Sequence, residues 1–109
     1  MGTDYSKLPP SIEAMQPSAK TVSVDVEYCS AWGGLKEANF TEKIIKHVFP
    51  KASVKVHSPG KTNDLVVRVD GKVVFQKKTN GGMNEKNAQE MIRQLETLAR
   101  AWSAAINTR

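Results

Sequence analysis

A strand of alternating residues that ends at a lone cysteine constrains this chain more than any other feature. Between Thr21 and Tyr28, every second residue is apolar and those between are polar. This period of two predicts a β-strand with one buried face. The strand leads directly into Cys29, the only cysteine of the protein, and Trp32 and Gly33-Gly34 follow. The sequence therefore predicts a thiol at the carboxyl end of a strand, on a loop that precedes a helix.

Two helices are predicted from apolar residues that recur at helical spacing. The first covers about residues 35–48 and ends at Phe49-Pro50, because the residue before a proline is pushed out of the helical region. The second begins near Asn84, which can cap its first turn, and its apolar stripe continues to Trp102 and Ile106. Both stripes are typical of core-facing helices, so we interpret Trp102 as a packing residue.

Three further strands are predicted between these helices. Residues 53–57 alternate again, and residues 65–69 and 72–76 flank Asp70-Gly71, a strong signal for a hairpin. A simple two-residue turn would make both faces of this hairpin apolar, whereas one face of the first strand is acidic. Two explanations stay open: a bulge resets the register, or the hairpin presents an apolar patch on the open side of the sheet.

The predicted order β-α-β-β-β-α indicates one α/β domain. A four-stranded mixed sheet with both helices on one face, a two-layer sandwich, explains the polar face of the first strand. The first two strands are expected to be parallel, because a helical crossover joins them. Residues 1–20 hold three prolines and no sustained periodicity, so they are predicted to form a flexible N-terminal arm ahead of a domain over residues 21–109. Docking of the segment from Leu8 to Met15 onto the domain is the alternative.

Composition argues against several classes of protein. One cysteine excludes an internal disulfide, and with two scattered histidines it makes a poor set of zinc ligands, so no metal is expected. The net charge is +5, but basic residues do not cluster beyond Lys77-Lys78, and we expect no nucleic-acid partner. No apolar run approaches the roughly 20 residues of a membrane span, and no signal peptide is recognisable. The expectation is a cytoplasmic protein without a membrane partner.

The residues around the cysteine resemble a known redox family. Val26-Glu27-Tyr28-Cys29-Ser30-Ala31-Trp32-Gly33 is similar to the selenoprotein W signature, in which a strand ends in Tyr-Cys, two small residues, selenocysteine or cysteine, and Gly. Residues 67–75 resemble the hairpin of that family, and Lys77 and Gly81-Gly82 resemble what precedes its last helix. The resemblance covers about residues 22–95 and implies a thioredoxin-like fold.

Trp32 is the main departure from that family. It stands where the family usually carries selenocysteine, which is encoded by UGA, and we hypothesise recoding, substitution or divergence at this position. An indole has no nucleophilic chalcogen, so it cannot resolve a mixed disulfide and dithiol activity is expected to be compromised. The chain as written can run a one-thiol cycle, in which Cys29 forms a mixed disulfide and an outside thiol such as glutathione releases it.

The topology expected from the resemblance brings three connections to one end of the sheet. They are the loop after Cys29, the start of the third strand and the segment before the last helix, and the arrangement resembles the glutathione-binding end of glutaredoxins. Helix N-termini there favour a thiolate, and glycines let backbone N–H groups approach a carboxylate. The residues expected to bind glutathione or another substrate are Ser30, Ala31, Asn63, Asp64, Lys77, Gly81 and Gly82. The proline of thioredoxins and glutaredoxins before the third strand is missing, and Asn63-Asp64 occupies that stretch.

The resemblance implies an antioxidant or redox-regulatory protein. It implies no tightly bound cofactor and glutathione as a co-substrate. The partners that it implies are protein thiols and 14-3-3 adaptor proteins. Such a protein would be a glutathione-dependent thiol–disulfide oxidoreductase, although Trp32 leaves its status as an enzyme open. An alternative of another class also stays open: a non-catalytic interaction module that holds a partner with the Cys29–Gly34 loop and the apolar face of the hairpin.

Overall fold

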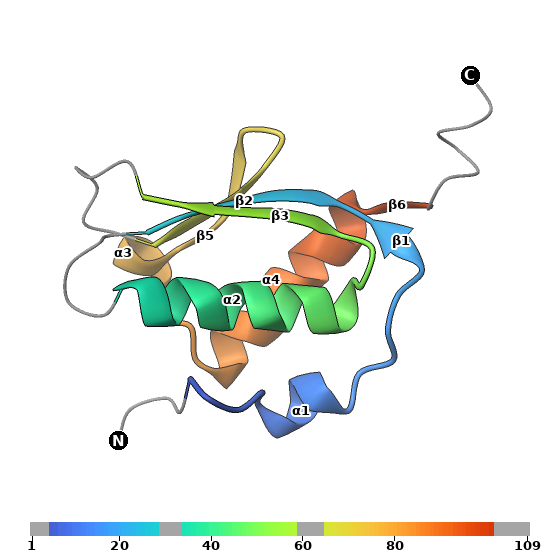
Figure 1. The fold of residues 1–109 in the computed structure, drawn as a ribbon, viewed down its shortest axis with the longest axis horizontal. Helices are drawn as coiled ribbons and strands as arrows, with labels where there is room; N and C mark the ends of the chain where they lie inside the picture. Colours follow the sequence, from blue (N-terminus) through green and yellow to red (C-terminus); the bar gives the residue numbers. More distant parts are fainter. Residues whose placement is uncertain (1–4, 29–33, 59–64, 102–109) are drawn as a thin grey trace.

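The computed structural model describes residues 5–28, 34–58 and 65–101, and Figure 1 shows their arrangement. The elements in chain order are α1 (Pro10–Glu13), β1 (Lys20–Thr21), β2 (Ser23–Glu27), α2 (Gly34–Val48), β3 (Ser53–His57), β4 (Val66–Val69), β5 (Lys72–Gln76), α3 (Lys77–Asn80), α4 (Glu85–Leu98) and β6 (Arg100–Ala101). Each of the predicted strands and both predicted helices have a counterpart in this order.

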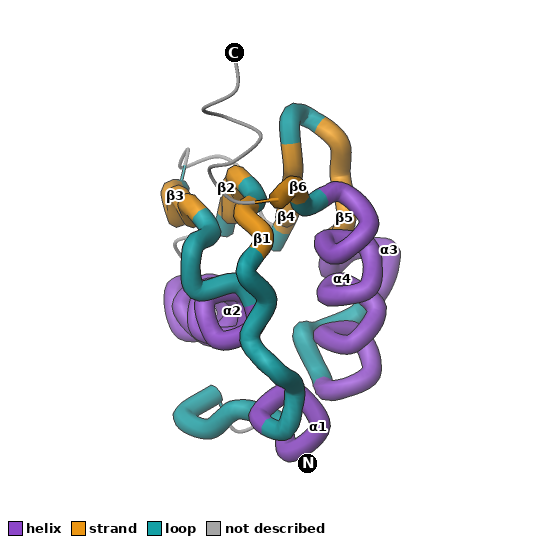
Figure 2. The backbone as a smooth tube through the Cα atoms, turned by 90° about the vertical axis from the view of Figure 1, so that its right-hand side faces the viewer, coloured by secondary structure: helices purple, strands orange, loops and turns teal. Residues whose placement is uncertain are grey.

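Four strands form one mixed sheet in the order β3-β2-β4-β5. β2 and β3 are parallel, and the pairs β2–β4 and β4–β5 are antiparallel. Helices α2 and α4 both lie on the same side of this sheet, as Figures 1 and 2 show from two directions. The predicted two-layer α/β architecture is therefore confirmed, and it is compatible with a thioredoxin-like fold.

The core lies between the sheet and the two long helices. Val24 and Val26 of β2 are buried in it, while Asp25 and Glu27 alternate to the other face and stay partly exposed. The largest fully buried side chains from all parts of the fold are Phe40, Phe49, Ile12, Ile44, Ile45, Met83, Met91 and Leu95. Each such side chain contributes about 1.5–3 kcal/mol when it leaves water, so this cluster is the main source of stability.

A register shift in the hairpin decides between the two explanations left open by the sequence. Val67 pairs with Phe75, but the next residue, Arg68, pairs with Val73, so Val74 is the extra residue of a bulge. Val74 and Phe75 are consequently both buried in the core, and Val73 is left 44% exposed. The bulge is thus confirmed, and it removes most of the apolar patch that an unshifted hairpin would present.

Two segments near the last helix differ from the sequence prediction. Residues 77–80, expected as a loop, form the short helix α3, and the Asn80 side chain accepts a hydrogen bond from the backbone N–H of Gln76 at 3.0 Å. α4 ends at Leu98 because the chain turns extended at Ala99 and β6 then pairs with β1. Trp102 and Ile106, expected to continue the helical stripe, lie outside the described residues.

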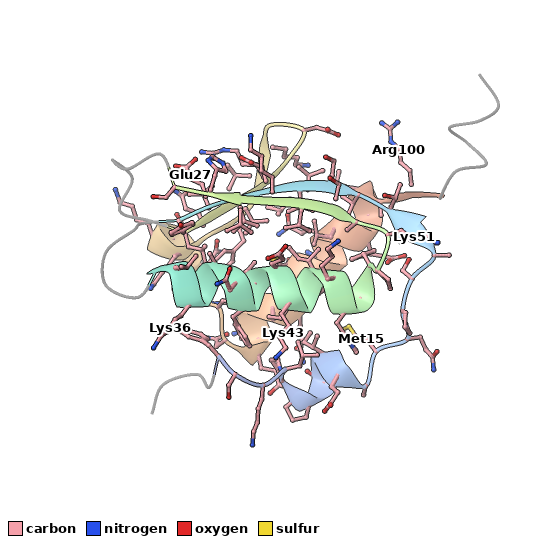
Figure 3. The ribbon with its side chains drawn as sticks, viewed as in Figure 1. Met15, Glu27, Lys36, Lys43, Lys51 and Arg100 are labelled. Atoms are coloured by element: carbon pink, nitrogen blue, oxygen red, sulfur yellow. The ribbon has the colours of Figure 1, made fainter. Side chains whose placement is uncertain are left out.

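The described part of the arm packs against the two long helices, which agrees with the docking alternative for residues 8–15. Ile12 of α1 is fully buried, and the ring of Tyr5 lies on Phe40 with 5.0 Å between ring centroids. α1 lies against the outer side of α2 and α4, opposite the sheet (Figure 2). Figure 3 shows Met15 and Lys43 between the arm and α2. A four-residue helix is too short to show a helical periodicity, so the sequence pattern could not decide between a docked and a flexible arm.

Candidate functional site

One end of the sheet collects the described residues that flank the cysteine loop. β2 and β3 end together there, and the backbone N–H of Tyr28 donates to the carbonyl of His57 at 3.1 Å. β4 begins beside them, since Val66 pairs with Glu27. The chain runs from Tyr28 directly into Cys29, and α2 starts at the same end of the sheet (Figure 1). The described residues thus bring the end of β2 and the start of α2, the two predicted flanks of the thiol, to the same end of the sheet.

Most of the predicted site residues lie in two stretches, 29–33 and 59–64, that fall outside the described residues. Their flanks are described, and both stretches start from the carboxyl ends of the parallel strands β2 and β3. The roles of the following residues stay predictions: Cys29, Ser30, Ala31, Trp32, Asn63 and Asp64. Lys77, Gly81 and Gly82 are described, and their contacts can be compared with the expected binding role.

A buried carboxylate, Glu37, is the central polar group of the described part of this region. It lies in the first turn of α2, and its side chain is 4% exposed. One carboxylate oxygen accepts a hydrogen bond from Lys77 Nζ at 2.8 Å, and the other accepts from the backbone N–H of Met83 at 2.8 Å. A carboxylate removed from water is strongly unfavourable unless it is paired and hydrogen-bonded, and these two bonds meet that need.

Two of the three described candidate residues, Lys77 and Gly82, lie beside Glu37. Lys77 is its ion-pair partner, and a Cβ added at Gly82 would lie 3.4 Å from its Oε2 atom. Gly81 ends α3 with a φ of +88°, where glycine is strongly favoured, and its N–H donates to the Lys77 carbonyl at 2.8 Å. The cation and Gly82 therefore do adjoin a carboxylate, but that carboxylate belongs to the chain itself. Their binding of a ligand stays a prediction.

Asn87 holds the turn between α3 and α4 and was not singled out from the sequence. Its side-chain amide donates to the carbonyl oxygens of Asn80 at 2.8 Å and Gly82 at 2.7 Å. Its backbone N–H donates to the side chain of Asn84 at 2.8 Å, so the predicted N-cap of α4 is confirmed. These bonds fix the segment whose Met83 N–H reaches Glu37. No local pattern marks such a residue, because its partners are defined only by the turn.

Tyr5 brings the arm to the same carboxylate. Burial raises the pKa of Tyr5, and the neighbouring charge of Glu37 and a hydrogen bond with it raise the pKa further, against a smaller opposing effect of Lys77. Glu37, at the start of α2, is therefore in contact with two segments that are distant in the sequence: the arm and the residues from α3 to the α3–α4 turn. A glutamate in a first helical turn is usually an exposed residue that favours the helix dipole, so its sequence position gave no sign of this.

The open face of the sheet carries paired charges. His57 Nε2 lies 3.0 Å from the Asp25 carboxylate, and Arg68 donates to Glu27 at 2.8 Å. These side chains are partly exposed, so each pair contributes little to stability. The pairs account for the polar alternation of β2 and support its interpretation as a solvated face rather than an acid–base site.

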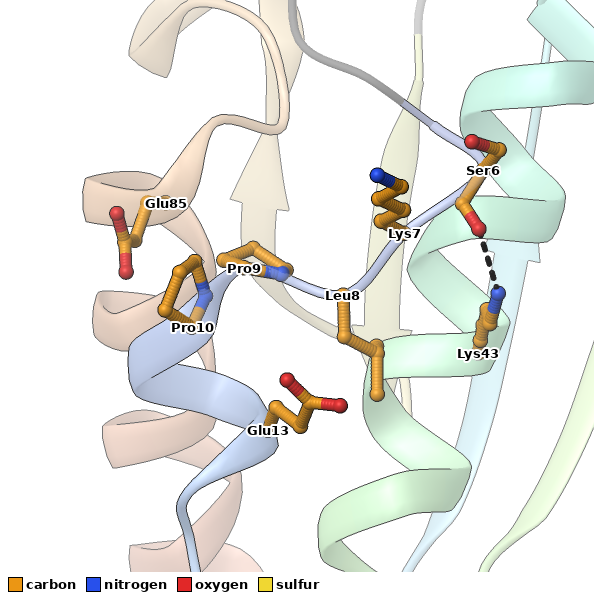
Figure 4. A pocket seen from close by; sticks show the side chains of 8 residues that line it. All are labelled: Ser6, Lys7, Leu8, Pro9, Pro10, Glu13, Lys43 and Glu85. Carbon is orange, nitrogen blue, oxygen red and sulfur yellow. Dashed lines mark hydrogen bonds between the residues drawn. The ribbon is translucent and has the colours of Figure 1, made fainter.

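A surface hollow of about 700 Å³ lies on the other side of the helices, under the arm. Its lining includes Leu8, Pro9 and Glu13 from the arm and Glu85 from α4, as Figure 4 shows. Lys43 Nζ reaches from α2 to the carbonyl of Ser6 at 3.1 Å along one side. Within the described part of the chain, no group of three or more potential metal ligands comes together. The hollow lies on the face of the helices that is turned away from the sheet.

The mixed sheet, the helices on one face and the strand that runs into Cys29 define a thioredoxin-like α/β protein. Residues 23–96 match the Rdx family, which includes selenoprotein W and other thioredoxin-like proteins, and the chain belongs to this family. It is thus a redox-related protein of the thioredoxin type. The match starts with β2, so the arm lies outside it. No curated protein compared with the chain matches it. None of the described helices is long and apolar enough to span a bilayer.

Proposed function

We propose that this protein is a one-thiol redox protein of the selenoprotein W type, with Cys29 as the nucleophile. Membership of the Rdx family supports redox chemistry. The single observation that carries the proposal is the position of Tyr28, hydrogen-bonded to the end of β3 and directly before Cys29, at the end of the sheet where α2 begins. A thiol beside a helix N-terminus is favoured as the thiolate, which is the reactive form.

The proposed cycle needs one protein sulfur. The Cys29 thiolate attacks a disulfide of an oxidised target, a new S–S bond forms to one target sulfur, and the other leaves as a thiolate. A glutathione thiolate then attacks Cys29, releases the second target thiolate and leaves glutathione on Cys29. A second glutathione frees the Cys29 thiolate and departs as oxidised glutathione. The target disulfide gains two electrons, and two glutathione molecules lose one each.

Trp32 is proposed to stand at the position of the second redox atom of the family. The codon for residue 32 in the source gene tests how it came there, because a UGG codon in the native gene would leave divergence as the explanation. Glutathione, thioredoxin and 14-3-3 adaptor proteins are proposed partners, and their support is the family resemblance. The cytoplasm is the proposed location on the same ground.

Mass spectrometry after treatment with oxidised glutathione tests the proposal directly. We expect one glutathione adduct on Cys29 and its removal by reduced glutathione, with Cys29→Ser as the matched control. The alkylation rate of Cys29 against pH reports access and the thiolate fraction together. A Cys29 that reacts no faster in the folded chain than in urea would contradict the proposal.

A second test places a thiol at position 32, where the family has its second redox atom. A Trp32→Cys variant is expected to gain dithiol activity toward insulin, because the starting protein is expected to be compromised in this activity. Trp32→Ser is the control, because it removes the indole without adding a thiol. If Trp32→Cys gains nothing, the binding module becomes the better explanation.

One observation favours the interaction module as a second candidate. Leu35, in the first turn of α2 and adjacent to the Cys29–Gly34 loop, is 47% exposed. The hairpin offers a smaller apolar surface to a partner than expected, because the bulge buries Val74 and leaves Val73 as the exposed valine of β5. A partner held without redox chemistry would bind equally to the Cys29→Ser variant and more weakly to Leu35→Ser.

A further inference from the structure

We infer that docking of the arm stabilises the α3–α4 turn, so that release of the arm loosens this turn. The turn consists of residues 81–84, between the end of α3 and the start of α4. The arm reaches it by two contacts, one through Glu37 and one at Glu85, the first residue of α4. The inference goes beyond the proposed function and does not depend on it, because it concerns only two described segments.

The first contact places Tyr5 beside the carboxylate that holds the turn. Glu37 and Phe40 are three residues apart on α2, so their side chains share one face of the helix. The ring of Tyr5 lies on Phe40 with 5.0 Å between ring centroids, and its hydroxyl forms a hydrogen bond with Glu37. Glu37 also accepts a hydrogen bond from the Met83 N–H of the turn at 2.8 Å. One carboxylate therefore bonds both to the arm and to the turn.

Burial makes the two bonds of this carboxylate depend on each other. With the arm docked, the Glu37 side chain is 4% exposed, so water has little access to it as a substitute for Lys77 or Met83. A hydrogen bond to a charged group is stronger in such a poorly solvated position than in water. Release of Tyr5 would admit water to the carboxylate, and this water would compete with the Met83 N–H. Docking of the arm therefore strengthens the bond that holds the turn.

The second contact lies directly after the turn. The Ser11 hydroxyl and backbone N–H both donate to the Glu85 carboxylate, and the Gln89 amide donates to the Ser11 hydroxyl at 2.7 Å. Glu85 is two residues after Met83, so these bonds fix the start of α4 close to the point where Glu37 holds the turn. The two contacts use different residues of the arm and support the same coupling.

The coupled segment includes residues for which the sequence predicts ligand binding. Gly81 and Gly82 belong to the turn, and Lys77 bonds to the same carboxylate as the turn. The arm lies outside residues 23–96, which match the Rdx family. The arm is therefore a regulatory element outside the matched region, and its docking determines how firmly the turn is held.

Native-state hydrogen exchange of the full chain, followed by NMR, tests the coupling. The Met83 N–H reports on the turn. The Glu13 N–H, which donates to the Pro9 carbonyl at 2.9 Å, reports on docking, because a four-residue helix is not stable by itself. Ile12→Asp should release the arm, because Ile12 is fully buried and an unpaired carboxylate is strongly unfavourable there. Gln16→Asp adds the same charge at an exposed position of the arm and is the matched control.

Release of the arm should speed exchange in the turn specifically. In Ile12→Asp we expect the Glu13 N–H to lose its protection. The Met83 N–H should exchange about tenfold faster, beyond any change in the amides of β2 and β4, which report global unfolding. Gln16→Asp should change the exchange of Met83 by less than about twofold. Tyr5→Phe keeps the ring and removes the hydroxyl, so it should speed exchange of Met83 about threefold while the arm stays docked.

Three results would overturn the inference. The first is a Met83 N–H that stays protected after release of the arm, or that changes only in step with β2 and β4. The second is a Glu13 N–H that stays protected in Ile12→Asp, because the arm could then not be released from the domain. The third is loss of the whole fold in Ile12→Asp, because the arm would then be part of the core rather than a separable element.

The coupling must also act in the reverse direction, since a coupling free energy is reciprocal. Asn87→Ala removes the two side-chain bonds that close the turn, and it leaves the arm unchanged in sequence. The Glu13 N–H is expected to exchange about threefold faster in this variant, again beyond any change in β2 and β4. Lys86→Ala, at the exposed position before it on α4, is the control and should have no effect. Unchanged exchange of Glu13 in Asn87→Ala would show that the arm and the turn are independent.

Discussion

Glu37 of α2 and Lys77 of α3 form an ion pair of 2.8 Å in which the carboxylate is 4% exposed and the lysine is half exposed. The pair joins the helix that follows the cysteine loop to the segment that precedes α4. The same carboxylate also accepts a hydrogen bond from the Met83 N–H, and it forms a third one with Tyr5. The effect of this ion pair on stability can be measured by substitution.

Removing Lys77 should destabilise the fold more than neutralising Glu37. Lys77→Met leaves a buried carboxylate with one partner fewer, and we expect a loss of about 1–3 kcal/mol in the free energy of unfolding, less than for a fully buried pair because the lysine is half exposed. Glu37→Gln keeps an acceptor for Met83 and leaves no buried charge, so its loss should be smaller. Urea unfolding measures both, with the exposed Lys72→Met as the control at under about 0.5 kcal/mol. The reverse order would contradict the burial argument.

The arm should contribute to the stability of the domain. Ile12 is fully buried, so Ile12→Ala is expected to lower the free energy of unfolding by about 2–4 kcal/mol through lost burial and a cavity. Urea unfolding of the full chain measures this. Glu13→Ala, on the exposed side of α1, is the matched control. A change under about 0.5 kcal/mol for Ile12→Ala would mean that the arm is detached in solution.

Alkaline pH should loosen the arm. The folded-state pKa of Tyr5 is raised above its usual 10.0, so docking is favoured while the phenol is neutral, below that pH. This contribution is lost as pH rises through the raised pKa, because the phenolate is repelled by Glu37. Absorbance at the phenolate band, compared between the starting protein and Tyr5→Phe, isolates the titration of Tyr5. A midpoint at or below 10.0 would show that Tyr5 does not adjoin Glu37 in solution.

Acid pH should weaken the second contact that holds the arm, the hydrogen bonds from Ser11 to Glu85. The Ser11 hydroxyl and backbone N–H donate to Glu85 at 2.5 and 3.1 Å, and these bonds lower the pKa of Glu85. The bonds stabilise docking above the unfolded-state pKa, and the contribution is lost as pH falls through the lowered folded-state value. Carboxyl NMR titration should therefore show the pKa of Glu85 rising toward its usual range in Ser11→Ala. If the pKa of Glu85 does not rise in Ser11→Ala, the arm does not dock at Glu85 in solution.

The sequence pattern predicted correctly those elements of the fold that depend on residues close together in the chain. Alternation in β2 and β3, the apolar stripes of α2 and α4, and the Asn84 cap each depend on neighbours a few residues away. Asp70 and Gly71 take φ values of +52° and +82°, as the predicted tight turn requires. The parallel pairing of β2 and β3 also followed, because a helical crossover joins these two strands.

Contacts between distant segments were beyond that kind of reasoning. The burial of Ile12, the bulge at Val74 and the occupation of Lys77 by Glu37 all arise from which surfaces meet after the chain has folded. A proline-rich segment looks flexible until a groove between two helices receives it, and a lysine before a helix looks ready for a ligand until a buried carboxylate is found beside it. Cys29 could be recognised as the candidate nucleophile from its neighbours in the chain. The ion pair of Lys77 with Glu37 could not be predicted in this way, because burial and charge pairing are properties of the assembled fold and not of any short stretch of residues.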